Sequence, residues 1–397
     1  MRPMSPQERL KFAVWGLLPL VLLGGVIWAF FAFDPTAPLR AGFPPVEELT
    51  IERIELPRPG EVIVYVVNGG PEPVTIAQVL VNEAYWRHTV EPDRTVPRLG
   101  RARVVIPYPW VEGEPLDITL LSSIGLRFEG RVEVAVQSPR PNWRYFAIFS
   151  LLGAYVGLIP VFLGLGWFPF LKRLGRAWMG FLLSLTAGLL LFLGVDALEE
   201  ALEIVERLPS AFQGGPLLAL SVLLSFLGVA AVQEVGLARR SEAARLLGLS
   251  YFIALGVGLH NLGEGLAIGA AYALGEVALG TLLVLGFTLH NTTEGIAIVA
   301  PLLRLGLPRA RLLLHLALMG VIAGGPTITG TWIGGFVYSD LAALIFFGIG
   351  AGAIFEVIYE IVRFLARTER SLLGVPQVAG LLVGLLIMYL TGLLVAA

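Results

Sequence analysis

The chain has 397 residues, of which 56% are hydrophobic and only 15% are charged, against about 25% charged residues in soluble domains. This composition excludes a disordered chain, a nucleic-acid-binding surface and an ordinary cytosolic enzyme. The net charge of −2 indicates no particular partner, and the absence of Cys excludes disulfides, thiolate zinc sites and iron–sulfur clusters. An integral membrane protein is the class that remains.

The first predicted element is a membrane anchor. Residues 12–33 form an uncharged run that is long enough, as a helix, to cross a hydrocarbon layer of about 30 Å. The run ends in aromatic residues before Asp34 and lacks a small-residue cleavage site, so we expect a retained anchor and not a signal peptide. Residues 1–33 are therefore predicted to be a cytoplasmic N-terminus followed by a transmembrane helix.

Residues 34–141 have a different sequence pattern, with short segments of alternating polarity separated by Gly- and Pro-rich turns. This pattern is typical of strands and predicts an extracytoplasmic β-sandwich inserted between the anchor and the rest of the chain. Its charges are scattered along the segment. We expect a structural or surface role for its one histidine, His88. The sequence does not identify a partner for this domain. The predicted strands are 47–56, 61–68, 73–82, 101–108, 116–123 and 131–138.

The remainder, residues 142–397, contains eight further apolar runs. With the anchor they predict an all-α polytopic membrane bundle of nine crossings that carries the all-β domain as an insertion. The connection between the fourth and fifth runs, around Gly275, is very short. The runs lie near 145–170, 178–198, 216–236, 248–272, 279–302, 312–335, 341–362 and 373–396.

The loops between these runs indicate how the protein is oriented. Fifteen basic residues fall on one side of the predicted bundle, and Arg207 is the only one on the other side outside the β domain. Since basic loops stay in the cytoplasm, the N-terminus is predicted to be cytoplasmic and the C-terminus extracytoplasmic. We expect the plasma (inner) membrane as the location.

Ionisable residues inside the fourth and fifth runs form a repeated motif. The fourth run reads HNLGEG and the fifth HNTTEG, which places His260 and Glu264, and then His290 and Glu294, at i and i+4 on one helical face. Such residues are costly inside a bilayer and usually serve a function. One pair alone is equally consistent with an internal hydrogen bond or ion pair, but two identical pairs favour a shared site.

The short turn also sets the depth of the two motifs. Because the helices are antiparallel about that turn, His260 is level with Glu294 and Glu264 is level with His290. If the faces meet, two imidazoles and two carboxylates form a quadrilateral that suits zinc and other first-row divalent ions. One divalent ion would neutralise the two carboxylates.

The paired HNLGEG and HNTTEG motifs resemble the HNxPEG signatures of the ZIP (Zrt/Irt-like) divalent metal transporters, and the likeness covers about residues 145–397. The resemblance implies movement of a metal ion toward the cytoplasm, and it implies six metal ligands. The segment DALEEALE at 196–203 resembles the end of the second helix in that family, which would place Asp196 and Glu200 at the outer entrance. The six implied ligands are His260, Asn261, Glu264, His290, Asn291 and Glu294.

Some positions depart from the family pattern. The motif prolines are replaced by Gly263 and Thr293, and Gly325 stands where the sixth helix of the family has an acid before a proline. A bridging ligand is therefore expected to be missing, which predicts one bound ion and not two. The first helix and the β domain are additional to the family pattern.

Further ionisable residues lie in or near the other runs. Glu356 is predicted to lie near the depth of Glu264, where it is either a fifth ligand, a proton acceptor or a hydrogen-bond partner of Thr327 or Thr329. Glu360 resembles an acid near the inner end of the same helix in the family, and it is a further possible pathway residue. Glu234 and His315 lie near predicted cytoplasmic ends, which favours solvated or capping roles.

Three functions remain open from the sequence. A metal transporter without enzymatic activity is the leading hypothesis, with zinc as the expected substrate and iron, manganese or cadmium as alternatives. An intramembrane zinc hydrolase is the second, although the chain has no HExxH motif. A metal-stabilised receptor that does not transport is the third. A homodimer is possible, and the sequence does not decide between passive and proton-coupled flux.

Overall fold

The computed structural model describes residues 6–33, 46–174, 178–237, 241–369 and 371–396. The chain divides into two compact units, Met1–Val46 and Glu47–Ala397. In the first, α1 (Pro6–Phe33) is helical over the whole predicted anchor. The first residues of the predicted β domain, 34–45, lie outside the described residues, as do these loop cations: Arg2, Arg176, Arg239, Arg240 and Arg370.

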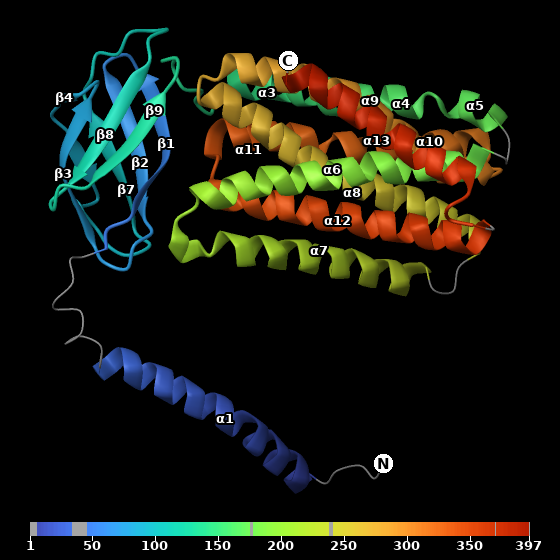
Figure 1. Ribbon diagram of the computed structural model, residues 1–397, viewed down its shortest axis with the longest axis horizontal. Coiled ribbons are helices and arrows are strands. Elements are labelled where there is room, and N and C mark those ends of the chain that lie inside the picture. The colour runs from blue at the N-terminus through green and yellow to red at the C-terminus, as the bar shows by residue number, and fades with distance from the viewer. Residues whose placement is uncertain (1–5, 34–45, 175–177, 238–240, 370, 397) are drawn as a thin grey trace. The chain divides into compact units, whose positions relative to one another are not determined.

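The second unit contains a helical bundle and a smaller β region (Figure 1). Within its described residues, eight helical segments are long and apolar enough to cross a membrane, and they overlap the eight predicted runs. Most are single helices, whereas the first and sixth are interrupted. In chain order the segments are α3 (Trp143–Gly153) with η1 (Ala154–Leu158), α4 (Ile159–Leu165) and α5 (Phe168–Leu171); α6 (Met179–Arg207); α7 (Gly214–Leu237); α8 (Glu242–Ala273); α9 (Val277–Val299); α10 (Arg309–Gly324) with α11 (Pro326–Val337); α12 (Asp340–Thr368); and α13 (Val375–Ala396).

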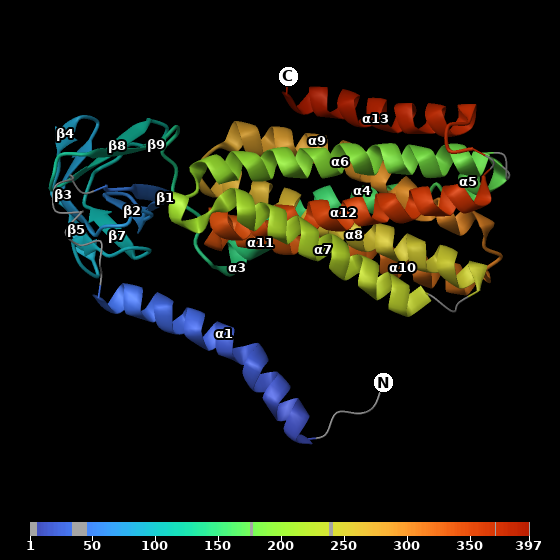
Figure 2. The same ribbon diagram turned by 60° about the horizontal axis from the view of Figure 1, so that its bottom comes forward.

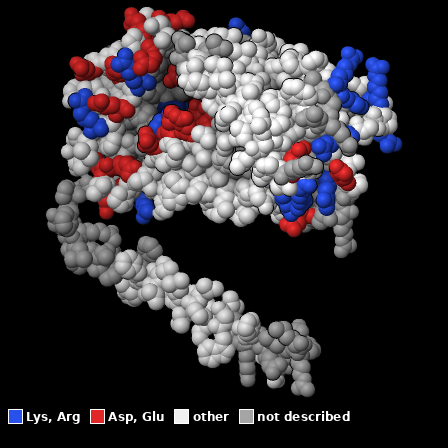
Figure 3. All heavy atoms as spheres, turned by 45° about the vertical axis from the view of Figure 1, so that its right-hand side comes forward, with Lys and Arg blue, Asp and Glu red and all other residues white. Residues whose placement is uncertain are grey.

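Charged side chains are concentrated at the ends of the bundle. Figure 3 shows a broad belt free of Lys, Arg, Asp and Glu between the β region and the far end of the bundle, where basic residues gather. Large apolar side chains such as Leu223, Leu224 and Leu227 on α7 are exposed. An apolar belt between charged ends is the surface expected of an integral membrane protein.

The second span, α6, continues well beyond its predicted end at residue 198 and reaches Arg207. The extension is amphipathic, because Ala197, Ala201 and Ile204 recur at helical spacing and are buried, while Glu203 between them is exposed. The prediction ended the helix too early because it followed hydrophobicity alone, and the helical period persists after the uncharged run stops.

Two spans contain local irregularities at prolines. In the first span, η1 is a π-helical turn that ends at Leu158, two residues before Pro160. The sixth span is divided between α10 and α11, and Pro326 is the first residue of α11. Proline lacks a backbone N–H, so each one removes a hydrogen bond from the helix that it enters.

The helix α8 packs mainly against α9, α10, α11 and α12, and it lies within the bundle in both views (Figures 1 and 2). Glycines allow its closest approach, to α11. A Cβ atom on Gly265 or Gly269 would overlap backbone carbonyls of α11, and one on Gly330 or Gly334 would overlap backbone carbonyls of α8. These glycines therefore allow the two helix backbones to pack closely.

The β region consists of two antiparallel sheets whose buried residues form one hydrophobic core. The predicted strands at 47–56, 61–68, 73–82, 101–108 and 116–123 are all present, and shorter strands were missed. One sheet has the order β1 (Leu49–Arg58), β2 (Glu61–Asn68), β7 (Arg101–Ile106), β5 (Thr89–Glu91), and the other β4 (Ala84–Tyr85), β3 (Val74–Val81), β8 (Leu116–Ser122), β9 (Arg127–Val132), with β6 (Thr95–Val96) paired to β3.

The predicted strand at 131–138 is wrong. The last strand is β9, which ends at Val132 because its partner β8 begins at Leu116 and the two residues are paired in register. Beyond this point the chain leaves the sheet, and Ser138 donates its backbone N–H to Leu56 O of β1 over 3.0 Å. The prediction was wrong because the polar–apolar alternation of the sequence continues after Val132, where β8 has no further residue to pair with.

The β region contacts the loops at one end of the bundle. Glu48, just before β1, accepts hydrogen bonds from the backbone N–H and the hydroxyl of Ser210 over 2.8 and 2.7 Å. In the turn between α8 and α9, a Cβ on Gly275 would lie 2.7 Å from Val134 O. Gly275 also has a φ of +81°, which favours glycine. The short turn between the two motif helices therefore packs closely against the segment that follows β9.

Candidate metal centre

Two uninterrupted helices, α8 and α9, carry the four ionisable motif residues. The side chains of His260, Glu264, His290 and Glu294 are all buried, with exposed fractions between 1% and 6%. Both motif helices therefore direct their ionisable faces into the bundle and away from the apolar belt.

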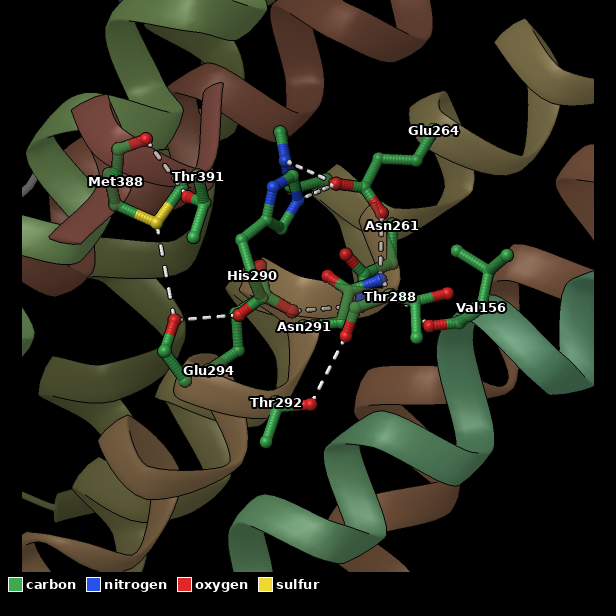
Figure 4. A network of polar contacts seen from close by, with 12 residues as sticks. Val156, Asn261, Glu264, Thr288, His290, Asn291, Thr292, Glu294, Met388 and Thr391 are labelled. Carbon is green, nitrogen blue, oxygen red and sulfur yellow. Dashed lines mark hydrogen bonds and ion pairs between the residues drawn. The ribbon is translucent and has the colours of Figure 1, made fainter. Parts of the chain in front are cut away.

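Glu264 lies between the two histidines. Its Oε1 contacts Nε2 of His290 and lies 3.2 Å from Nε2 of His260. Its second oxygen, Oε2, accepts a hydrogen bond of 2.9 Å from the Asn291 amide. Figure 4 shows Glu264 directed toward the His290 and Asn291 side chains. The pairing of Glu264 with His290 is the cross-helix contact that the motif spacing predicts.

Glu294 lies on the other side of the cluster. One nitrogen of His260, one nitrogen of His290 and one oxygen of Glu294 lie within 4.8 Å of one another. Asn261 donates to Glu294 Oε2 over 3.1 Å. The four ionisable side chains thus meet as the depth argument predicts, although Glu264 joins through its contacts with the imidazoles and is not one of the three groups within mutual reach.

Several polar atoms of the cluster are buried without a hydrogen-bond partner. They are both ring nitrogens of His260, of which Nε2 has only its ion-pair contact with Glu264, Oε1 of Glu294, and the amide oxygens of Asn261 and Asn291. Most buried polar atoms in proteins are satisfied, and unsatisfied ones require an explanation. The carboxylate and amide oxygens offer electron pairs only, so a cation is the kind of partner that suits them.

The charge of the cluster also favours a cation as its partner. Two carboxylates are buried in an apolar bundle, where an uncompensated charge is costly. One divalent cation with two neutral imidazoles balances both carboxylates. Imidazole and carboxylate together suit zinc and related first-row ions, whereas calcium and magnesium prefer oxygen ligands alone.

The positions that depart from the family pattern have structural roles. Gly263 faces the ring of Phe347, and a Cβ there would lie 2.7 Å from a ring carbon. Thr293 donates its hydroxyl to the carbonyl of His290 over 2.6 Å within α9. Gly325 lies at the break between α10 and α11 and has no side chain to offer.

The predicted entrance acids lie on α6. Asp196 is half-buried. Glu200 follows one turn later in the chain and is exposed. Neither acid belongs to the group of three.

Glu356 is buried but lies apart from the cluster, in a different hydrogen bond from those predicted. Its carboxylate accepts a hydrogen bond of 2.5 Å from the Gln233 amide of α7. It makes no hydrogen bond to Thr327 or Thr329. Sequence reasoning missed Gln233 because a lone amide near a helix end carries no pattern.

Glu360, predicted as a further pathway residue, is half-buried and lies 3.5 Å from Arg363. Together with Glu356 and Gln233 it lines a cavity of about 890 Å³ between α7, α8 and α12. These residues therefore belong to a separate polar region of the bundle.

The remaining histidines and Glu234 lie outside the cluster, and His315 contacts a neighbouring helix instead of taking the solvated or capping role predicted for it. His315 Nδ1 lies 2.8 Å from the Tyr251 hydroxyl, and His88 Nδ1 lies 3.4 Å from Trp86 O. Glu234 is exposed. The structure thus places His260 and His290 in the cluster and leaves the other two histidines outside it.

The site is a buried His/Glu cluster inside a polytopic apolar bundle. Neither a scan against protein-family models nor a search of curated proteins finds a match to this chain.

Proposed function

We propose that this protein transports divalent metal cations across a membrane, with zinc or a similar first-row ion as its substrate, and that it is a member of the ZIP family. The observation that carries the proposal is the buried group of His260, His290 and Glu294, within 4.8 Å of one another, completed by Glu264. The repeated motif on adjacent helices and the electron-pair donors without hydrogen-bond partners support it.

The proposed direction of transport is toward the cytoplasm. We infer this direction from the resemblance to the family. The basic residues at the end of the bundle distant from the β region support a cytoplasmic location for that end. In this proposal α1 is a ninth crossing, and the two sheets form an extracytoplasmic β-sandwich.

Metal uptake into sealed proteoliposomes tests the function directly. A panel of zinc, iron, manganese and cadmium ions is supplied outside, and the metal retained inside is counted by mass spectrometry. We expect zinc uptake to exceed that of protein-free vesicles, and Glu264→Gln to remove it. Glu276→Gln is the matched control, because Glu276 is an exposed acid in the turn between the same two helices.

The same assay separates the alternatives. A receptor with a structural metal binds an ion but shows no uptake. A hydrolase activates a metal-bound water, for which a separate general base is usual; it would cleave an added peptide or ester in a metal-dependent way without moving metal. Bound metal without uptake would overturn the transport proposal.

A further inference from the structure

The β region contacts two separate connections between spans at the same end of the bundle. At the connection between α6 and α7, Glu48 accepts hydrogen bonds from the backbone N–H and the hydroxyl of Ser210. At the turn between α8 and α9, a Cβ on Gly275 would lie 2.9 Å from Cγ2 of Val136. One of the two connections therefore belongs to the helix pair that carries the metal cluster, and the other does not.

The segment that contacts the α8–α9 turn is itself bound to the β region on both sides of Val136. The backbone N–H of Ala135 donates to Glu114 O over 2.9 Å. The backbone N–H of Ser138 donates to Leu56 O over 3.0 Å, and the backbone N–H of Leu56 donates to the Ser138 hydroxyl over 2.9 Å. A displacement of the turn is therefore transmitted to the β region as a whole.

One strand joins the two contacts. β1 begins at Leu49, next to Glu48, and Leu56 lies near its other end. The eight residues from Glu48 to Leu56 correspond to about 26 Å of extended chain, and β1 is paired with β2. The two sheets share one hydrophobic core, and close-packed cores are stiff. The β region therefore links the α8–α9 turn to the α6–α7 connection at a fixed separation.

Outward opening of the metal site requires helices to move relative to one another. The four ionisable side chains of the cluster have exposed fractions of 1% to 6%, so an ion reaches them only when the surrounding helices separate. Within the described residues α8 packs mainly against α9, α10, α11 and α12, whereas α6 packs mainly against α12 and α13. Transporters open by moving one group of helices against another around the site. Movement of the motif helices away from α6 changes the separation that the β region fixes.

We propose that the β region restrains the outward opening of the metal site by linking the turn of the motif helices to the α6–α7 connection. The inference rests on the proposed function, because a restraint on opening matters only if an ion crosses the bundle. The two contacts act in series, since loss of either one frees the turn from the α6–α7 connection. The restraint lowers the rate of transport and leaves the metal ligands unchanged.

Zinc uptake into proteoliposomes by full-length variants tests the restraint. Glu48→Ala removes both hydrogen bonds to Ser210 and should raise the initial uptake rate by about 3- to 10-fold, the effect of one or two net hydrogen bonds on an equilibrium. Val136→Ala removes two methyl groups from the contact with the α8–α9 turn and should raise the rate as well. The double variant should be no faster than the faster single variant, because the contacts act in series.

The matched control is Glu61→Ala. Glu61 pairs with Arg58 inside the β region, where its side chain accepts a hydrogen bond of 2.9 Å. This variant should take up zinc at the parental rate. The affinity for Co²⁺, which favours ligands similar to those of zinc, should be the same in the parent protein and in all of these variants.

A cross-link tests the restraint in the opposite direction. The chain contains no cysteine, so an introduced pair forms one defined disulfide. A Cβ on Gly69 would overlap Cβ of Pro209 in the α6–α7 connection, so Gly69→Cys combined with Pro209→Cys brings the two Cβ atoms into disulfide range after a small shift. Oxidation of this pair should slow zinc uptake below the parental rate, and reduction should restore it. Adding Val136→Ala should weaken the effect of oxidation.

Four results would overturn the proposal. They are an unchanged or lower uptake rate in folded Glu48→Ala protein, additive gains in the double variant, an equal gain in Glu61→Ala, and an uptake rate that does not respond to oxidation of the cysteine pair. Absence of zinc uptake by the parent protein would instead contradict the proposed function.

Discussion

Glu264 on α8 contacts the Nε2 atom of His290 on α9, although 26 residues separate them in the chain. The contact exists because the turn between the helices is short and the two helices run antiparallel from it. Glu264 also lies 3.2 Å from His260 Nε2, so one carboxylate serves both imidazoles. Glu264 is therefore the residue of the cluster whose loss affects the most partners.

This relationship predicts the order of effects among carboxylate variants. Removing one partner of a buried charged group costs about 3 to 5 kcal/mol, so Glu264→Ala and Glu294→Ala should each reduce metal affinity by at least about 100-fold and abolish flux. The loss should be larger for Glu264→Ala. Competition with a chromophoric chelator measures the affinities, and circular dichroism checks the fold. Parental uptake in either variant would show that the cluster is not the transport site.

The dependence on external pH follows from the chemistry of the ligands. Protons and the metal compete for imidazole nitrogens and carboxylate oxygens, so lowering the pH favours the metal-free site. Flux should therefore fall as external pH drops below about 6, where free imidazole becomes protonated. Initial uptake rates over a pH series at fixed internal pH measure this effect. Rates that rise steadily toward pH 5 would contradict occupancy control and indicate coupling to protons.

The number of bound ions is predicted to be one per chain. Two adjacent ions require shared carboxylates and enough negative charge to offset them, and Gly325 supplies no acid. Glu356→Gln should leave the stoichiometry unchanged, because Glu356 is bonded to Gln233 and lies outside the cluster. Native mass spectrometry counts the ions. Two ions in the parent protein and one in this variant would show that Glu356 is a ligand.

The β region is predicted to be dispensable for the metal path. It contributes one histidine, His88, which lies outside the cluster. A chain lacking residues 1–141 should retain measurable flux, with lower stability because the contacts of Glu48 with Ser210 are lost. Glu48→Ala in the full chain isolates this contact, and its metal affinity should match that of the parent. Complete loss of flux from a correctly inserted truncated protein would contradict the prediction.

Glycine packing gives a prediction about stability. A Cβ on Gly265 would overlap Thr327 O, whereas a Cβ on Gly228 meets nothing within 4 Å. Gly265→Ala should therefore destabilise the bundle by about 1 to 3 kcal/mol, and Gly228→Ala should be neutral or slightly stabilising. Thermal unfolding in the same detergent compares the pair. Equal stability in the two variants would show that the α8–α11 approach is not tightly packed.

The sequence predicted the spans and the meeting of the motifs because both depend on local information. Uninterrupted hydrophobicity identifies a span, and the turn at Gly275 fixes the depths of His260 and His290 by chain length alone. The end of α6 was misplaced because polarity and helical period disagree there. The strand after β9 was misjudged because strand length depends on the partner, which alternation does not reveal.

The polar partners of the site were beyond sequence reasoning. Asn291 reaches the carbonyl of Val156, and Glu356 reaches Gln233, across distances in the chain that no periodicity connects. Pro160 was the one available signal, since a proline inside an apolar span frees a carbonyl four residues earlier. Which side chain donates a hydrogen bond to that carbonyl depends on how the helices pack.

The carbonyl of Val156 accepts a hydrogen bond from Asn291, and the carbonyl of Ala323 accepts one from Asn261. Both acceptors are main-chain atoms, so they do not depend on the side chains of Val156 and Ala323. Exchanging either residue for another small apolar one leaves the acceptor in place. Inserting or deleting a single residue between Val156 and Pro160, or between Ala323 and Pro326, moves the acceptor around the helix and away from its asparagine. The first and sixth spans should therefore tolerate changes of residue type at these points far better than changes of length.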